Sequence, residues 1–142
     1  MVDHYANKGL KVVLTSGPDK EEVEYLKQIE KLTKGNVINL GGKTSLIELA
    51  ALIKGSRFFI GLDSVASHIA AAVGVTGVAL FGPSNAVNWR PWSDKLSVIS
   101  REEEEFCEKH GHMEGKYKRC LCYISVETVS YTHLTLPTIL LV

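Results

Sequence analysis

The segment 61–72 brings a carboxylate, two hydroxyls and an imidazole close together in the sequence. Asp63 follows a short apolar run, and a stretch of small residues typical of a helix begins at Ser64. Unpaired N–H groups at a helix N-terminus bind phosphate, and His68, about one turn along, could donate to the same anion. Asp63 could accept hydrogen bonds from the hydroxyls of a sugar. The alternative is that Asp63 or Ser64 only caps the helix and that His68 is an incidental polar residue.

Two further segments could approach a ligand. Gly82, Pro83 and Ser84 follow another apolar run, and a loop of these residues could bring its backbone close to a ligand, although a plain turn explains them equally well. The segment 89–92, Trp-Arg-Pro-Trp, offers aromatic rings and a guanidinium for a sugar ring or a base. A structural anchor for a long loop is the alternative interpretation of this segment.

Gly41-Gly42-Lys43-Thr44 does not form a nucleotide-binding P-loop, because the motif needs a glycine at position 37, where this chain has valine. The residues that follow are better explained by helix capping, since Ser45 and Glu48 have the Ser-x-x-Glu spacing of a capping box. The first apolar run is not followed by a Gly-x-Gly-x-x-Gly fingerprint, which weakens an interpretation as a dinucleotide-dependent dehydrogenase.

A cluster of possible zinc ligands occurs late in the chain. Its members are Cys107, His110, His112, Cys120 and Cys122. Their spacing matches no standard zinc finger, and loops rich in such residues often bind nothing, so we predict no metal site here and keep these five as weak candidates.

The composition is that of a globular chain. Its 142 residues include 16 Lys+Arg and 16 Asp+Glu, and 45% are hydrophobic. A chain of net charge zero has no overall positive field for nucleic acid, so any phosphate binding must be local. No apolar run approaches the roughly 18–20 residues of a membrane span, and the N-terminus lacks the layout of a signal peptide. With only three cysteines, all late in the chain, a reducing cytoplasm is the expected compartment.

The apolar period alternates between strand-like and helix-like. Short apolar runs predict strands at 11–15, 37–40, 58–62 and 78–81, and spaced apolar residues predict helices at 21–32, 45–55 and 64–73. Such alternation predicts an α/β fold with a doubly wound parallel sheet, whose ligand site lies at the carboxyl ends of the strands. At 130–137 a threonine-rich segment with a proline breaks the helical pattern that begins at Ile124, and we expect residues 130–142 to be of foreign origin.

The motif residues together resemble a known family. Asp-Ser-x-x-Ser-His-Ile-Ala-Ala-Ala-x-Gly at 63–74, followed by Ala-Leu-Phe-Gly-Pro-Ser at 79–84, resembles the donor-binding domain of the family 9 glycosyltransferases, the ADP-heptose–lipopolysaccharide heptosyltransferases. The segments 13–19 and 89–92 are most similar to the type III, core-branching members. The resemblance covers residues 1–129 and implies the Rossmann-like C-terminal half of a GT-B fold.

This resemblance implies an inverting transferase that moves heptose from ADP-heptose to the lipopolysaccharide inner core and needs no cofactor. Asp63 would hold heptose hydroxyls, while Ser64, Val65 and His68 would meet the pyrophosphate and the sugar. The residues that would line the rest of the donor site are Thr44, Ser45 and Glu21 around the adenosine, and Gly82, Pro83 and Ser84 at its border.

In this family the carboxylate that deprotonates the acceptor lies in the N-terminal domain, so we expect this chain to bind the donor without turning it over. The complete enzyme would be cytoplasmic, peripherally associated with the inner membrane, and would bind no nucleic acid. Two alternatives are kept. One is another nucleotide-sugar enzyme of GT-B architecture, such as a UDP-sugar transferase or an epimerase. The other is a zinc-stabilised interaction domain built on the late cysteines and histidines.

Overall fold

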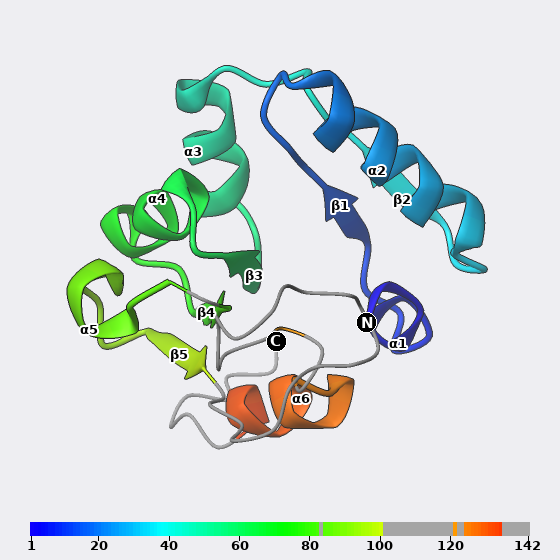
Figure 1. Cartoon of the computed structure of the whole chain (residues 1–142). Helices are drawn as coiled ribbons and strands as arrows, with labels where there is room; N and C mark the ends of the chain where they lie inside the picture. Colours follow the sequence, from blue (N-terminus) through cyan, green and yellow to red (C-terminus); the bar gives the residue numbers. More distant parts are fainter. Residues whose placement is uncertain (83, 101–120, 122–123, 135–142) are drawn as a thin grey trace, which may run out of the picture. The chain divides into compact units, whose positions relative to one another are not determined.

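The computed structural model describes residues 1–82, 84–100, 121 and 124–134. The chain divides into two compact units, Met1–Leu49 and Ala50–Val142 (Figure 1). Helices and strands alternate along the described residues, and every strand pair among them is parallel.

The first unit contains a two-stranded parallel sheet. Its elements are α1 (Val2–Ala6), β1 (Val12–Leu14), α2 (Lys20–Leu32), β2 (Val37–Asn39) and the start of α3 (Leu46–Lys54). β1 pairs with β2 so that Val13 lies opposite Ile38. The connection between these parallel strands passes through α2, as parallel pairing requires.

Local sequence explains where α2 begins and ends. Asp19 is its N-cap, and the carboxylate accepts the N–H of Glu21 at 2.8 Å and that of Glu22 at 3.4 Å. Aspartate is among the preferred residues at this position because its oxygen satisfies N–H groups that have no partner inside the helix. At the other end Thr33 leaves the helical conformation, and its hydroxyl donates to the carbonyl oxygen of Ile29 at 2.8 Å.

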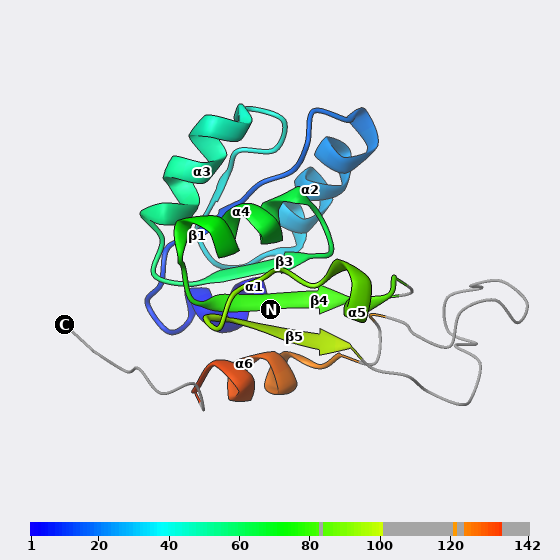
Figure 2. The ribbon, with the colours of Figure 1, turned by 90° about the vertical axis from the view of Figure 1, so that its left-hand side faces the viewer.

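The second unit contains a three-stranded parallel sheet with the order β3-β4-β5. Its elements are the rest of α3, then β3 (Phe59–Leu62), α4 (Val65–Val73), β4 (Gly77–Phe81), α5 (Ala86–Trp89), β5 (Leu96–Ser100) and α6 (Val126–Leu134). Figure 2 shows α4 and α6 on opposite faces of this sheet. The central strand, β4, is therefore covered on both sides.

The core of the second unit lies between the sheet and α6. Val78 of β4 and Val129 of α6 are fully buried, and Ile99 of β5 completes their cluster. Because side chains alternate along a strand, the side chain of the buried Ala79 in β4 points to the opposite face of the sheet, which is the face that α4 covers. Gly77 has no room for a side chain, since an added Cβ would meet the carbonyl oxygen of Phe59.

The predicted alternation and parallel pairing are confirmed, with the strands joined as two sheets, one in each unit. The strand β5 and the short helix α5 were not predicted. The prediction that the helical pattern breaks at Ser130 is wrong, because α6 continues to Leu134. Thr132 is accommodated by a hydrogen bond back to the helix, from its Oγ1 to the carbonyl oxygen of Thr128 at 2.8 Å. A foreign origin of residues 130–142 stays a prediction.

Within the part of the chain that the structure describes, no helix combines the length and the apolar character that crossing a membrane would require.

Candidate functional site

Asp63 lies at the carboxyl end of β3 and is fixed there by the neighbouring strand. Its backbone N–H donates to the carbonyl oxygen of Leu80 at 3.1 Å, just beyond the point where Leu62 pairs with Leu80. The residue is half-buried, and its carboxylate forms no hydrogen bond with any other described residue. A carboxylate with a fixed backbone and an uncommitted side chain is able to accept hydrogen bonds from two neighbouring hydroxyls of a ligand.

The start of α4, immediately after Asp63, is open. Ser64 is the N-cap in an extended conformation (φ −157°, ψ 173°), and its side chain makes no capping hydrogen bond. The first turn contains no acidic side chain, and both Ser64 and Val65 are exposed. N–H groups at a helix start lack partners inside the helix and carry its positive dipole end, so this corner is suited to an anion.

His68 lies one turn into α4 and is exposed. The side chains that α4 buries are those of Ser67 and Ala70, so the imidazole does not belong to the core. Side chains in a helix lean toward its N-terminus, which tilts the imidazole toward the open first turn. The predicted grouping of Asp63, Ser64, Val65 and His68 around one corner is therefore possible in this fold.

The loop after β4 lies at the same edge of the sheet, because β3 and β4 are parallel neighbours. Gly82 is buried, and an added Cβ would come within 3.4 Å of the Leu121 side chain. Ser84 is half-buried, and the Asn85 side chain after it caps α5 by accepting the N–H of Val87 at 2.9 Å. Pro83 lies outside the described residues.

In the segment 89–92 one residue is buried and the other three are exposed. Pro91 is fully buried, whereas Trp89 is 61% and Trp92 is 95% exposed. Arg90 is exposed as well. Pro91 therefore anchors the loop, whereas both indoles and the guanidinium remain accessible to a ligand.

Three of the predicted donor-site residues belong to the first unit. Thr44 is half-buried, and Ser45 is exposed in the turn before α3. The predicted capping box is present: Glu48 Oε2 accepts the Ser45 N–H at 2.8 Å, and Ser45 Oγ accepts the Glu48 N–H at 3.3 Å. These hydrogen bonds, the backbone one above all, hold the pKa of the Glu48 carboxyl below its ordinary value.

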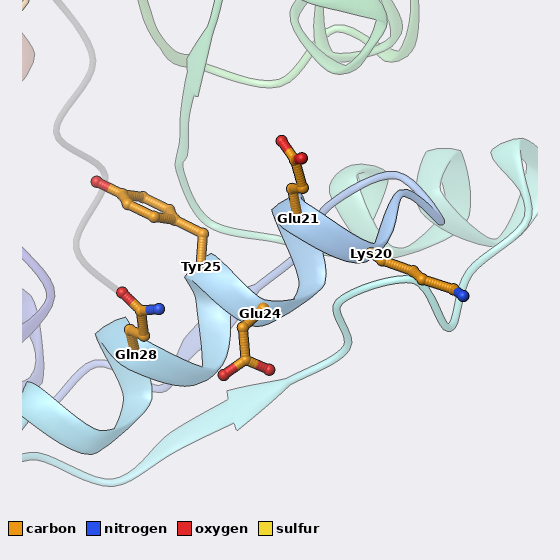
Figure 3. Close-up of a pocket in the computed structure, with 5 residues that line it drawn as sticks. All are labelled: Lys20, Glu21, Glu24, Tyr25 and Gln28. Atoms are coloured by element: carbon orange, nitrogen blue, oxygen red, sulfur yellow. The ribbon is translucent and has the colours of Figure 1, made fainter.

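Glu21, the third of these residues, borders a shallow hollow of about 340 Å³ along α2 (Figure 3). Figure 3 shows the side chains of Glu21, Tyr25 and Gln28 extending from the same side of the helix. The adjacent Glu22 is committed elsewhere, since its Oε2 accepts the Gly17 N–H at 2.9 Å. Of the two neighbouring glutamates, Glu21 is therefore the one with a carboxylate available to a ligand. Neither Tyr25 nor Gln28 belongs to a recognisable motif, so neither was predicted from the sequence.

The five weak metal candidates, from Cys107 to Cys122, lie outside the described residues. Among the residues that are described, no group of three or more His, Cys, Asp or Glu side chains is arranged to hold a metal ion.

Comparison with known proteins settles the family. Residues 1–118 match the model of glycosyltransferase family 9 (heptosyltransferase). The chain belongs to this family. Over 97 residues it is 41% identical to lipopolysaccharide heptosyltransferase 3 of Escherichia coli, and this alignment covers 68% of our chain and 28% of the E. coli protein. Over 91 residues it is 38% identical to lipooligosaccharide heptosyltransferase 2 of Haemophilus influenzae, and this alignment covers 63% of our chain and 26% of the H. influenzae protein.

Two solved structures of family 9 proteins share the fold. The family 9 glycosyltransferase of Veillonella parvula superimposes with a TM-score of 0.63 at 28% identity, covering 69% of this chain and 28% of that one. E. coli ADP-heptose lipopolysaccharide heptosyltransferase II gives a TM-score of 0.61 at 30% identity, covering 70% of this chain and 33% of that one. These matches confirm the predicted family and α/β fold class. The chain spans about 26–28% of the length of the two relatives named above.

Proposed function

We propose that this chain is the nucleotide-sugar-binding part of a heptosyltransferase that moves heptose from ADP-heptose to the lipopolysaccharide inner core. Membership of family 9 and the names of its relatives support this class of reaction. The single observation that carries the proposal is the open first turn of α4 beside the uncommitted carboxylate of Asp63. The proposed reaction takes place in the cytoplasm, at the inner membrane, where the full enzyme would associate peripherally.

The start of α4 and the Asp63 carboxylate bind different parts of the donor. The N–H groups at the start of α4, with His68, hold the diphosphate, and they stabilise the charge that develops on ADP as it leaves. Asp63 accepts hydrogen bonds from the heptose hydroxyls and so orients the anomeric carbon toward the acceptor. In an inverting transfer, the acceptor hydroxyl attacks from the face opposite ADP.

Deprotonation of that hydroxyl needs a general base within hydrogen-bond reach of the acceptor. The resemblance assigns this base to the N-terminal domain of a GT-B enzyme. We therefore propose that this chain on its own binds the donor but transfers no heptose.

Calorimetry on the 142-residue chain tests the proposal, with ADP, UDP and NAD as separate ligands. We expect binding of ADP and at least tenfold weaker binding of UDP and NAD. Preference for UDP would favour a UDP-sugar transferase, preference for NAD would favour an epimerase or related enzyme, and either result would refute the proposal.

A substitution separates sugar binding from phosphate binding. Asp63→Asn should weaken ADP-heptose binding by about tenfold, the equivalent of one hydrogen bond to a charged group, and leave ADP binding unchanged. Asp94→Asn, which neutralises an exposed carboxylate in another loop, is the matched control and should change neither affinity. If Asp63→Asn and the control behave alike, Asp63 does not hold the sugar.

A further inference from the structure

Three large apolar side chains lie exposed close together in the sequence after β4. Val87 is 82%, Trp89 is 61% and Trp92 is 95% exposed. Arg90, between the two tryptophans, is exposed too, and its guanidinium makes no hydrogen bond or ion pair with another described residue. We call these four residues the indole loop. Single exposed apolar residues are ordinary on a protein surface, whereas a group of them indicates a surface that a partner covers.

The backbone of the indole loop is held in place although its side chains are exposed. The Asn85 side chain caps α5 by accepting the N–H of Val87 at 2.9 Å. The Arg90 N–H donates to the carbonyl oxygen of Ala86 at 3.1 Å, and Pro91 is fully buried. Because the backbone is already ordered, a partner that covers these side chains does not have to pay the entropy of ordering a loop.

The polar atoms of the indole loop match a lipid headgroup better than a sugar. Indole N–H and guanidinium groups donate hydrogen bonds and accept none, whereas phosphate oxygens only accept. Sugar hydroxyls do both, and within residues 86–92 only Asn88 has a side-chain acceptor. Residues 84–93 contain no acidic side chain that would repel an anionic surface. Tryptophan and arginine can bury their apolar part at a bilayer surface while their polar ends stay among the headgroups.

The indole loop follows the strand end next to that of Asp63. β3 and β4 are parallel neighbours, so the segments after them emerge at one edge of the sheet, and Figure 2 shows α5 and the start of α4 at this edge. The acceptor of the proposed reaction is joined to a lipid and stays in its bilayer. The edge that carries the donor site must therefore face that bilayer.

We propose that the indole loop enters the headgroup layer of an anionic membrane and turns the donor site toward it. The inference rests on the proposed function, which supplies the lipid-linked acceptor, and it names the surface that meets the membrane.

Tryptophan fluorescence of the 142-residue chain tests this directly, because Trp89 and Trp92 are its only two tryptophans. We expect vesicles of phosphatidylethanolamine and phosphatidylglycerol to shift the emission to shorter wavelength, and brominated acyl chains to quench it. Arg90→Gln should weaken binding to these vesicles about fivefold, the effect of one basic residue near an anionic surface. It should leave binding to pure phosphatidylcholine vesicles unchanged.

Trp92→Ala should weaken vesicle binding about tenfold in a sedimentation assay, since even partial burial of an indole contributes that much. Leu32→Ala, at a residue 81% exposed at the end of α2, is the matched control and should change nothing. Both variants should bind ADP as the wild type does, which shows that they are folded. Equal vesicle binding by the two variants would overturn the inference.

The remaining outcomes separate this inference from the proposed function. Vesicle binding without a change in tryptophan emission would overturn the inference, because another surface would then be the contact. An emission shift with the water-soluble, deacylated core saccharide and none with vesicles would overturn it in favour of a sugar platform. A chain that binds ADP but no vesicles contradicts the inference alone. One that binds vesicles through the indole loop but does not bind ADP contradicts the proposed function alone.

Discussion

Glu48 and Ser45 form a reciprocal capping box at the start of α3. Glu48 Oε2 accepts both the N–H of Ser45 at 2.8 Å and its hydroxyl at 2.7 Å. Because these bonds favour the ionised carboxylate, they lower the pKa of Glu48 in the folded chain. A group whose pKa is lower in the folded state stabilises the protein above its unfolded pKa and loses that contribution as pH falls.

Removing the charge of Glu48 should therefore destabilise the protein only at a pH where the wild-type carboxylate is ionised. Glu48→Gln should lower the thermal unfolding midpoint at pH 7, and the gap to wild type should narrow as pH falls below the ordinary value of 4.5. Thermal unfolding measured between pH 7 and pH 3 on both proteins checks this. A gap that stays constant across that range would show that the charge of Glu48 does not stabilise the helix.

Asp3 ties α1 to the turn between α2 and β2, and its removal should destabilise the chain. Its Oδ1 accepts the N–H of Lys34 at 2.9 Å and that of Gly35 at 3.1 Å. Asp3→Ala leaves both N–H groups without this acceptor and should cost about 1–2 kcal/mol in urea unfolding. Asp3→Asn keeps a carbonyl oxygen and should cost less. Glu24→Ala, which removes one partner of an exposed ion pair with Lys27, is the control and should stay within about 0.5 kcal/mol.

Gly77 should not tolerate a side chain. Its added Cβ would meet the carbonyl oxygen of Phe59 on the neighbouring strand and approach Leu96 Cδ2 to 3.0 Å. Gly77→Ala should therefore destabilise the second unit by about 1–3 kcal/mol, the usual cost of overpacking. At Gly55 the added Cβ would make only an ordinary contact at 3.5 Å, so Gly55→Ala should be nearly neutral in the same denaturation assay. Equal effects of the two variants would contradict this account of the strand packing.

Val129 tests whether α6 belongs to the folded core. The side chain is fully buried against Val78 and Ile99, and Val129→Ala should lower the free energy of unfolding by about 2 kcal/mol. Val87→Ala, at a residue 82% exposed, removes the same atoms from the surface and should have little effect. A neutral Val129→Ala would mean that α6 does not cover the sheet in solution.

The sequence predicted the elements that have strong local signals. The helix from Lys20 to Leu32 has its apolar residues on one face and an aspartate cap, and the helix after Ser45 has its capping box. β5 was missed because Leu96–Ser100 follows a loop with no helix long enough to mark a crossover. The end of α6 was mispredicted because threonine has low helix propensity, whereas burial of Val129 and Ser130 overrides that local preference.

The candidate site was predictable as a set of positions but not as a set of hydrogen bonds. The order of strand, aspartate and small-residue helix placed Asp63, Ser64 and His68 at one strand end, and the structure leaves Ser64 and His68 exposed. The sequence could not reveal that the hydroxyl of Ser67, and not that of Ser64, is bound within the first turn of α4, where it donates to the carbonyl oxygen of Ser64 at 2.8 Å, because both serines have the same donors and acceptors. Burial decides between them, and burial depends on the packing of α4 against β3.

The hydrogen bond from the Asp63 N–H to Leu80 has a consequence for the motions of the second unit. It ties the residue that would orient a sugar to the central strand of the sheet, so Asp63 can pull away only if the end of that strand loosens with it. A ligand that engages the Asp63 carboxylate would then slow amide hydrogen exchange at this N–H and along the end of β4.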